Sequence, residues 1–169
     1  MILIINILKG KDMCRNFLLD RKIDLKANQD IFLQLLENRK FDILIELFRS
    51  KILDINSKDN LGKNTLYWAM LDRNTKVVKK LLELNIELNV SKNLNAVNFA
   101  VYLDSVSILK CLKESGINLD ICDEINSTPI IYAILYKKKK SIDFLLKQDV
   151  NLEHEDFMGN CAKSLLKLA

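Results

Sequence analysis

The side chains best suited to metal binding or nucleophilic chemistry are four cysteines, Cys14, Cys111, Cys122 and Cys161, and the single histidine, His154. No two cysteines form a CxxC pair, whereas zinc sites are built from closely paired Cys and His ligands. We therefore expect no metal site. Nothing marks the chain as secreted, and we interpret the cysteines as free thiols in a reducing compartment.

Other catalytic patterns are also missing from the sequence. It contains no glycine-rich phosphate loop, no nucleophile elbow and no Cys/His pair with an evident partner. His154 lies in the run Glu153–Asp156, which could indicate a metal or an acid–base site, but a solvated turn is the simpler interpretation. We expect no enzymatic activity, no catalytic residues and no cofactor.

The composition indicates that helices would position any functional side chains. The chain has 169 residues, of which 49% are hydrophobic and 28% charged, so extensive disorder is excluded. It has one proline and four glycines, too few turn formers for a sandwich or barrel. A net charge of +4 is modest for a nucleic-acid binder, and we expect neither nucleic acid nor membrane as a partner.

The N-terminal run Met1–Leu8 is apolar but lacks the basic segment that begins a signal peptide, and no apolar run is long enough to span a membrane. We therefore expect a cytoplasmic protein, or one delivered into a host cell without a cleaved signal peptide.

A repeat of about 33 residues organises the sequence. The string Asn64–Ala69 recurs as Asn95–Ala100 and Thr128–Ala133, and the alanines are 31 and 33 residues apart. A leucine follows each alanine after twelve residues, at Leu81, Leu112 and Leu145. Weaker copies extend the repeat in both directions. We predict a single domain, 1–169, of units at about 1–25, 26–55, 56–88, 89–119, 120–152 and a truncated 153–169.

Each unit predicts two short helices, because apolar residues recur at helical spacing in both halves. One such pair cannot bury its apolar stripe alone, so the units must stack. The best copy, Asp123–Ala133, resembles the ankyrin repeat, and the turns 59–62 and 156–159 also match it. The resemblance implies an all-α solenoid with projecting β-hairpin fingers.

Two details of the repeat predict local backbone structure. Gly62, Asn126 and Gly159 share one position, which fits a backbone with positive φ. Pro129 falls at the first turn of a helix, where its missing N–H is harmless. The sequence departs from the family at the motif histidine, which is replaced by Tyr67, Asn98, Ile131 and Ser164.

The resemblance implies a module that binds a protein partner through its finger tips and the concave face of the first helices. By position, the candidate contacts are Leu61, Lys63, Leu71, Lys92, Tyr102, Glu124, Ile125, Tyr136, Phe157 and Met158. The apolar tips could also fold back on neighbouring fingers. Trp68, Phe99 and Tyr132 predict an aromatic column, which we interpret as packing between repeats.

Charge is unevenly placed in this scheme. The later fingers are acidic, which favours a partner with a basic surface. The run Lys137–Lys140 lies in a helix–helix turn on the opposite edge and is interpreted as solvated. We expect a monomer. The alternatives are a scaffold that self-assembles, with Met1–Leu8 as a possible seam, and an inhibitor, immunity-type or host-directed effector protein of an AT-rich organism.

Overall fold

The computed structural model describes residues 25–168, with side chains described from Asn28 to Lys167. Contacts divide the chain into two compact units that meet between Ser57 and Lys58. Each unit is described by itself. The predictions made for Met1–Leu8 and Cys14 lie outside the described residues.

The described part of the first unit, residues 25–57, forms a helix pair, α3 (Leu25–Glu37) and α4 (Phe41–Arg49). Arg39 lies in the turn between the helices with a φ of 54°. Phe32 and Leu36 on α3 are buried, as are Leu44 and Ile45 on α4. This pair corresponds to the unit predicted at about 26–55.

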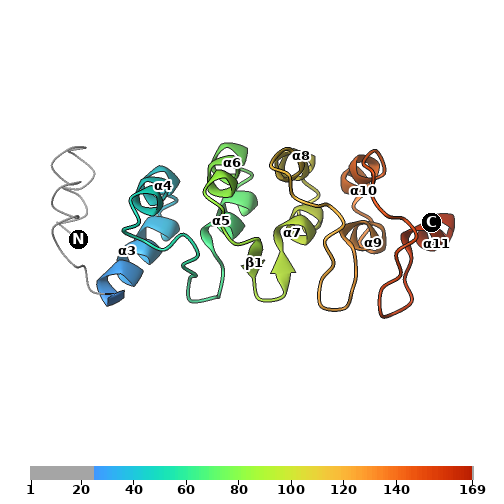
Figure 1. Ribbon diagram of the computed structural model, residues 1–169, viewed down its shortest axis with the longest axis horizontal. Coiled ribbons are helices and arrows are strands. Elements are labelled where there is room, and N and C mark those ends of the chain that lie inside the picture. Colours follow the sequence, from blue (N-terminus) through green and yellow to red (C-terminus); the bar gives the residue numbers. More distant parts are fainter. Residues whose placement is uncertain (1–24, 169) are drawn as a thin grey trace. The chain divides into compact units, whose positions relative to one another are not determined.

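The second unit contains three helix pairs and a final helix: α5 (Thr65–Leu71) with α6 (Thr75–Glu83), α7 (Ala96–Tyr102) with α8 (Val106–Glu114), α9 (Pro129–Leu135) with α10 (Lys139–Leu145), and α11 (Ala162–Leu168). The short strands β1 (Asn89–Ser91) and β2 (Leu94–Asn95) form an antiparallel hairpin before α7. Figure 1 shows α6, α8 and α10 in one row, α5, α7 and α9 in another, and the finger loops beyond the second row. The prediction of an all-α solenoid is confirmed.

The core runs along the stack. Ala69, Ala100 and Ala133 on the first helices are completely buried, and so are the repeated leucines Leu81 and Leu112 on the second helices. Helix α7 contacts both α5 and α9, and α8 contacts both α6 and α10. Each repeat of this unit is therefore covered by its neighbours, which is how a solenoid buries apolar faces that one pair would expose.

Asparagines begin three of the helices. The side chains of Asn64, Asn74 and Asn95 each accept a hydrogen bond from the backbone N–H three residues later, at distances of 3.0, 3.2 and 2.8 Å. This is the N-cap arrangement that satisfies an otherwise unpaired helical donor. Asn64 also donates through Nδ2 to the Glu87 carbonyl, 3.0 Å away, so its cap is tied to the segment that leads into the next finger. Pro129 is at the first position of α9, as predicted.

An aspartate holds each of three finger turns. The Oδ1 atom of Asp59 accepts hydrogen bonds from the N–H groups of Leu61 and Lys63, at 2.8 and 2.9 Å. Asp123 and Asp156 make the same two bonds to the residues two and four positions later. The turn then requires a left-handed residue, and Gly62, Asn126 and Gly159 have φ values of 72°, 59° and 79°. Their predicted positive φ is confirmed.

Replacing Gly62 by alanine should lower the free energy of unfolding by about 1 kcal/mol, the cost of a left-handed L-residue. A Cβ atom at Gly62 meets nothing within 4 Å, so the loss would come from backbone strain alone. Urea unfolding followed by circular dichroism measures it. Gly62→Asn is the matched control and should lose less stability, because asparagine adopts left-handed backbone more readily than alanine. An unchanged stability for Gly62→Ala would contradict the assignment.

Among the described residues, Cys111, Cys122 and Cys161 are free thiols. None of the helices described is both long and apolar enough to cross a membrane.

Candidate partner-binding surface

The predicted contact residues lie on the fingers and at the ends of the first helices. Leu61, Lys92, Glu124, Ile125, Phe157 and Met158 are exposed on fingers, and Leu71, Tyr102 and Tyr136 are exposed at or just after the ends of α5, α7 and α9. Lys63 differs, because it is only half-buried and its Nζ lies 4.5 Å from the Tyr67 ring centroid. Its ammonium rests on an aromatic face instead of projecting from the finger.

The apolar finger tips point into solvent. Phe157 and Met158 expose 77% and 75% of their surface, and Leu61 exposes 68%. The Phe157 N–H donates to the Ile125 carbonyl, 3.1 Å away, so backbone atoms join these two fingers while the Phe157 side chain stays outside. Lys92 occupies the intervening tip, so the apolar tips do not form an unbroken line.

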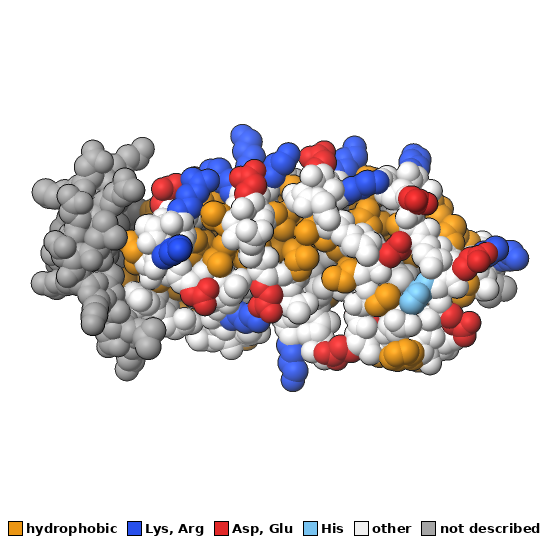
Figure 2. Space-filling model, viewed as in Figure 1, with side chains coloured by type: hydrophobic (Ala, Val, Ile, Leu, Met, Phe, Trp, Pro, Cys, Tyr) orange, Lys and Arg blue, Asp and Glu red, His pale blue; other side chains and the backbone are white. Residues whose placement is uncertain are grey.

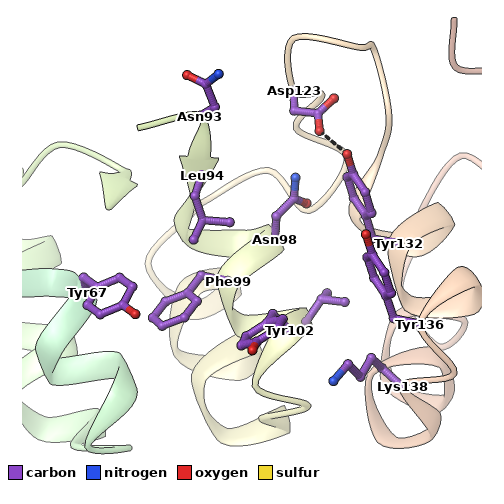
Figure 3. A pocket seen from close by; sticks show the side chains of 11 residues that line it. Tyr67, Asn93, Leu94, Asn98, Phe99, Tyr102, Asp123, Tyr132, Tyr136 and Lys138 are labelled. Atoms are coloured by element: carbon purple, nitrogen blue, oxygen red, sulfur yellow. Dashed lines mark hydrogen bonds between the residues drawn. The ribbon is translucent and has the colours of Figure 1, made fainter. Parts of the chain in front are cut away.

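A pocket of about 610 Å³ lies against α5, α7 and α9 and the fingers before α7 and α9. Aromatic rings form much of its wall (Figure 3). Phe99 stacks on Tyr67, with centroids 4.4 Å apart and planes at 9°, and its centroid is 6.2 Å from that of Tyr102. Tyr132 and Tyr136 form a second stacked pair, with a centroid distance of 5.8 Å and an interplanar angle of 2°. These rings therefore give part of the pocket flat, apolar walls.

Sequence reasoning placed Tyr102, Tyr136 and the finger residues Asn93 and Leu94 among the positions that could contact a partner, but it missed most of the pocket lining. The missed residues are Tyr67, Asn98, Phe99, Val101, Asp123, Tyr132 and Lys138. A signal did exist, because Tyr67 and Asn98 stand at the motif-histidine position on consecutive first helices. Only their spatial neighbours show that the two positions open onto one pocket.

Asp123 connects the finger turn to the pocket. Its Oδ2 atom accepts a hydrogen bond of 2.5 Å from the Tyr132 hydroxyl, while Oδ1 holds the turn. Burial, together with this hydrogen bond to a carboxylate, raises the pKa of Tyr132 well above its ordinary value. Tyr132 is therefore a neutral hydrogen-bond donor at physiological pH. Asp59 accepts the equivalent bond from Trp68 Nε1, at 2.8 Å, two fingers earlier in this unit.

The three residues of the predicted aromatic column make different contacts. Trp68 and Tyr132 hydrogen-bond to finger aspartates, whereas Phe99 has no polar atom and stacks on Tyr67. The ring that stacks on Phe99 from the preceding repeat is therefore Tyr67, the residue before Trp68. The interpretation of this site as packing holds for Phe99, which is 2% exposed.

The interpretation of Lys137–Lys140 as a solvated turn needs correction for Lys138, which is half-buried. Its Nζ lies 5.1 Å from the Tyr102 ring centroid, and the residue lines the pocket. Lys137, just before it, has a left-handed backbone with a φ of 52°. Lys139 and Lys140 follow on α10 and are exposed.

The interpretation of His154 as part of a solvated turn also needs correction. The residue is half-buried, and its Nε2 lies 2.8 Å from the Asn126 carbonyl oxygen, to which it donates. Cys122 Sγ is 3.6 Å from the same nitrogen. Burial and the nearby Asp123 and Asp120 raise the pKa of Cys122, so this thiol is not activated. His154 joins two neighbouring fingers.

The second helices present a different surface. Figure 2 shows most of the Lys and Arg side chains visible on this face along the edge formed by these helices. Exposed acidic groups lie among them, and Lys79 pairs with Glu114 across neighbouring repeats at 3.2 Å. The edge is therefore of mixed charge. Among the described residues, no cluster of three or more His, Cys, Asp or Glu side chains could hold a metal.

Comparison with known proteins also points to ankyrin repeat proteins. No family model matches the chain. Its relatives include the ankyrin repeat protein L371 of Acanthamoeba polyphaga mimivirus, 27% identical over 62% of this chain, and the phosphocholine transferase AnkX of Legionella pneumophila, 24% identical over 70%. An ankyrin repeat protein of Borreliella burgdorferi is 27% identical over 76% of the chain.

The matched region is a small part of the first two relatives. The chain spans 15% of L371 and 15% of AnkX, and 61% of the Borreliella burgdorferi protein. The similarity therefore concerns the repeats, and it agrees with the ankyrin resemblance and the helical solenoid.

Proposed function

We propose, from the chain's membership of the ankyrin repeat family, that it is a protein-binding module without chemistry of its own. The partner contacts the finger tips and the ends of the first helices. One observation carries this proposal: of the nine exposed large hydrophobic residues among those described, all except Leu146 lie on fingers or at the ends of first helices. Exposed apolar residues gathered on one surface are typical of interaction sites.

The surface also suits partner recognition in other respects. Aspartates and backbone hydrogen bonds fix the finger turns, so the tip side chains are presented without a large loss of backbone entropy on binding. Tyr102 and Tyr136 are 63% and 60% exposed, and tyrosine is favoured at interfaces. The acidic fingers would steer a partner with a basic surface.

A triple variant with Leu61, Ile125 and Phe157 changed to alanine tests the proposal. The wild-type and variant chains are used to capture proteins from the native cell extract, and the affinity of each captured protein is then measured with purified components. We expect at least a tenfold loss of affinity, since three interface anchors are truncated. The tips are exposed, so stability should stay within about 0.5 kcal/mol.

A second triple variant provides the matched control. Lys110, Leu146 and Lys147 are exposed on or next to the second helices, and their replacement by alanine should leave the affinity unchanged. If this control loses binding while the finger-tip variant keeps it, the partner contacts the second-helix edge and the proposed surface is wrong.

A further inference from the structure

The pocket between α7 and α9 offers flat faces for a planar group. Tyr132 and Tyr136 are nearly parallel, and Phe99 and Tyr102 differ by 15° in plane. Aromatic faces carry negative electrostatic potential, and they attract cations. The protein already uses this property at one end of the pocket, where Lys138 Nζ lies 5.1 Å from the Tyr102 ring centroid.

The other end of the pocket carries a negative charge. The hydrogen bonds described for Asp123 all come from neutral groups: the N–H groups of Ile125 and Ser127 and the hydroxyl of Tyr132. A carboxylate has about four lone-pair sites, so one remains for a further donor. Figure 3 shows Lys138 at the opposite end of the pocket from Asp123. The charge of Asp123 is therefore not neutralised by the lysine that lines the pocket.

Asn98 adds an unpaired polar group to the same pocket. The residue is 8% exposed, and its Oδ1 atom is buried without a hydrogen-bond partner. Figure 3 shows its amide directed toward the side of the pocket where Tyr132 and Asp123 lie. The terminal torsion of asparagine is broad, so a small rotation presents Oδ1 to a bound donor. An unpaired buried acceptor is costly, and a ligand donor would relieve that cost.

We propose that this pocket binds the arginine side chain of the partner protein, with the guanidinium against the Tyr132–Tyr136 pair and its N–H groups directed to Asp123 and Asn98. This deepens the proposed function and rests on it. Arginine fits better than lysine, because its planar guanidinium stacks on aromatic rings and carries several donors in a fixed fork. An anionic side chain would meet Asp123 and the unpaired Asn98 oxygen, and a purely apolar one would leave both unsatisfied.

Three blocked amino acids test the proposal on the full chain: the N-acetyl methylamides of arginine, lysine and citrulline. Each is titrated into isotope-labelled protein, and the amide signals are followed by nuclear magnetic resonance. We expect the arginine probe to shift the Asn98 side-chain signal with a dissociation constant on the order of 1 mM, typical for so small a ligand. Citrulline has the same shape without the charge and should bind about tenfold more weakly.

Variants separate the pocket from the finger turn. Asp123→Asn keeps the oxygen that accepts the turn hydrogen bonds but removes the charge, and it should weaken arginine binding about tenfold. Asp156→Asn is its matched control, because Asp156 holds the next finger in the same way and does not line the pocket. It should leave the affinity unchanged. Lys138→Gln removes a like charge and should tighten binding about threefold.

Three outcomes would overturn the proposal. They are equal binding of arginine and citrulline, equal binding of arginine and lysine, and the absence of any shift with the arginine probe. If the captured partner still binds in that case, the arginine assignment is wrong and the binding function stands. If partner binding also survives the loss of the finger tips, the proposed binding surface is wrong as well.

Discussion

Replacing Leu145 by alanine is expected to lower the free energy of unfolding by about 3 kcal/mol, whereas the same change at Leu146 costs no more than about 0.5 kcal/mol. The two leucines are adjacent in the chain, but Leu145 is completely buried and Leu146 is 42% exposed. Truncation of Leu145 removes apolar contacts and leaves a cavity between α9 and α10. Urea unfolding followed by circular dichroism gives both values.

The pair tests whether the core runs along the stack as described. Leu81 and Leu112 occupy the position of Leu145 in the two preceding repeats and are equally buried. Alanine at either position should therefore cost a similar amount. Equal losses for Leu145→Ala and Leu146→Ala would mean that α10 does not present this face to the core.

Replacing Asp104 by alanine is expected to cost about 2 to 3 kcal/mol. Asp104 lies in the turn between α7 and α8, and its Oδ1 atom accepts hydrogen bonds from both the N–H and the hydroxyl of Ser141, each at 2.8 Å. Ser141 is completely buried on α10, so loss of the carboxylate leaves two donors unpaired in the interior. Asp143→Ala, an exposed change on the same helix, should be nearly neutral.

The Asp104 contribution should depend on pH with a definite sign. Burial alone would raise the pKa of Asp104, but the hydrogen bonds from Ser141 and the nearby Lys140 outweigh it and hold the pKa below its ordinary value. A carboxyl group with a lowered folded-state pKa stabilises the fold above its unfolded pKa of about 4, and this stabilisation is lost as the pH falls further. The stability gap between wild type and Asp104→Asn should therefore shrink below about pH 4. A gap that widens on acidification would contradict this account.

Sequence reasoning succeeded where one residue type has one local consequence. Positive φ at Gly62, Asn126 and Gly159 follows from the repeat position, and the burial of Leu81, Leu112 and Leu145 follows from helical spacing. Both properties follow from the repeat spacing, without knowledge of which side chains meet in three dimensions.

The pocket could not be predicted in the same way, because its residues come from three repeats and meet only through side-chain direction. Lys138 was interpreted as solvated because its aromatic neighbour, Tyr102, belongs to the preceding repeat. His154 was interpreted as solvated because its partner, the Asn126 carbonyl, lies 28 residues earlier in the sequence. Contacts between fingers have no signature within a single repeat.

The aspartate that closes each finger turn has a consequence for how such a surface can evolve. Asp59, Asp123 and Asp156 hold their turns through backbone N–H groups, which every residue except proline supplies. The tip side chains play no part in those bonds, so mutation can exchange them while the scaffold stays intact. A lineage carrying these fingers can therefore acquire a new partner by drift at the tips, provided that the aspartates are inherited unchanged.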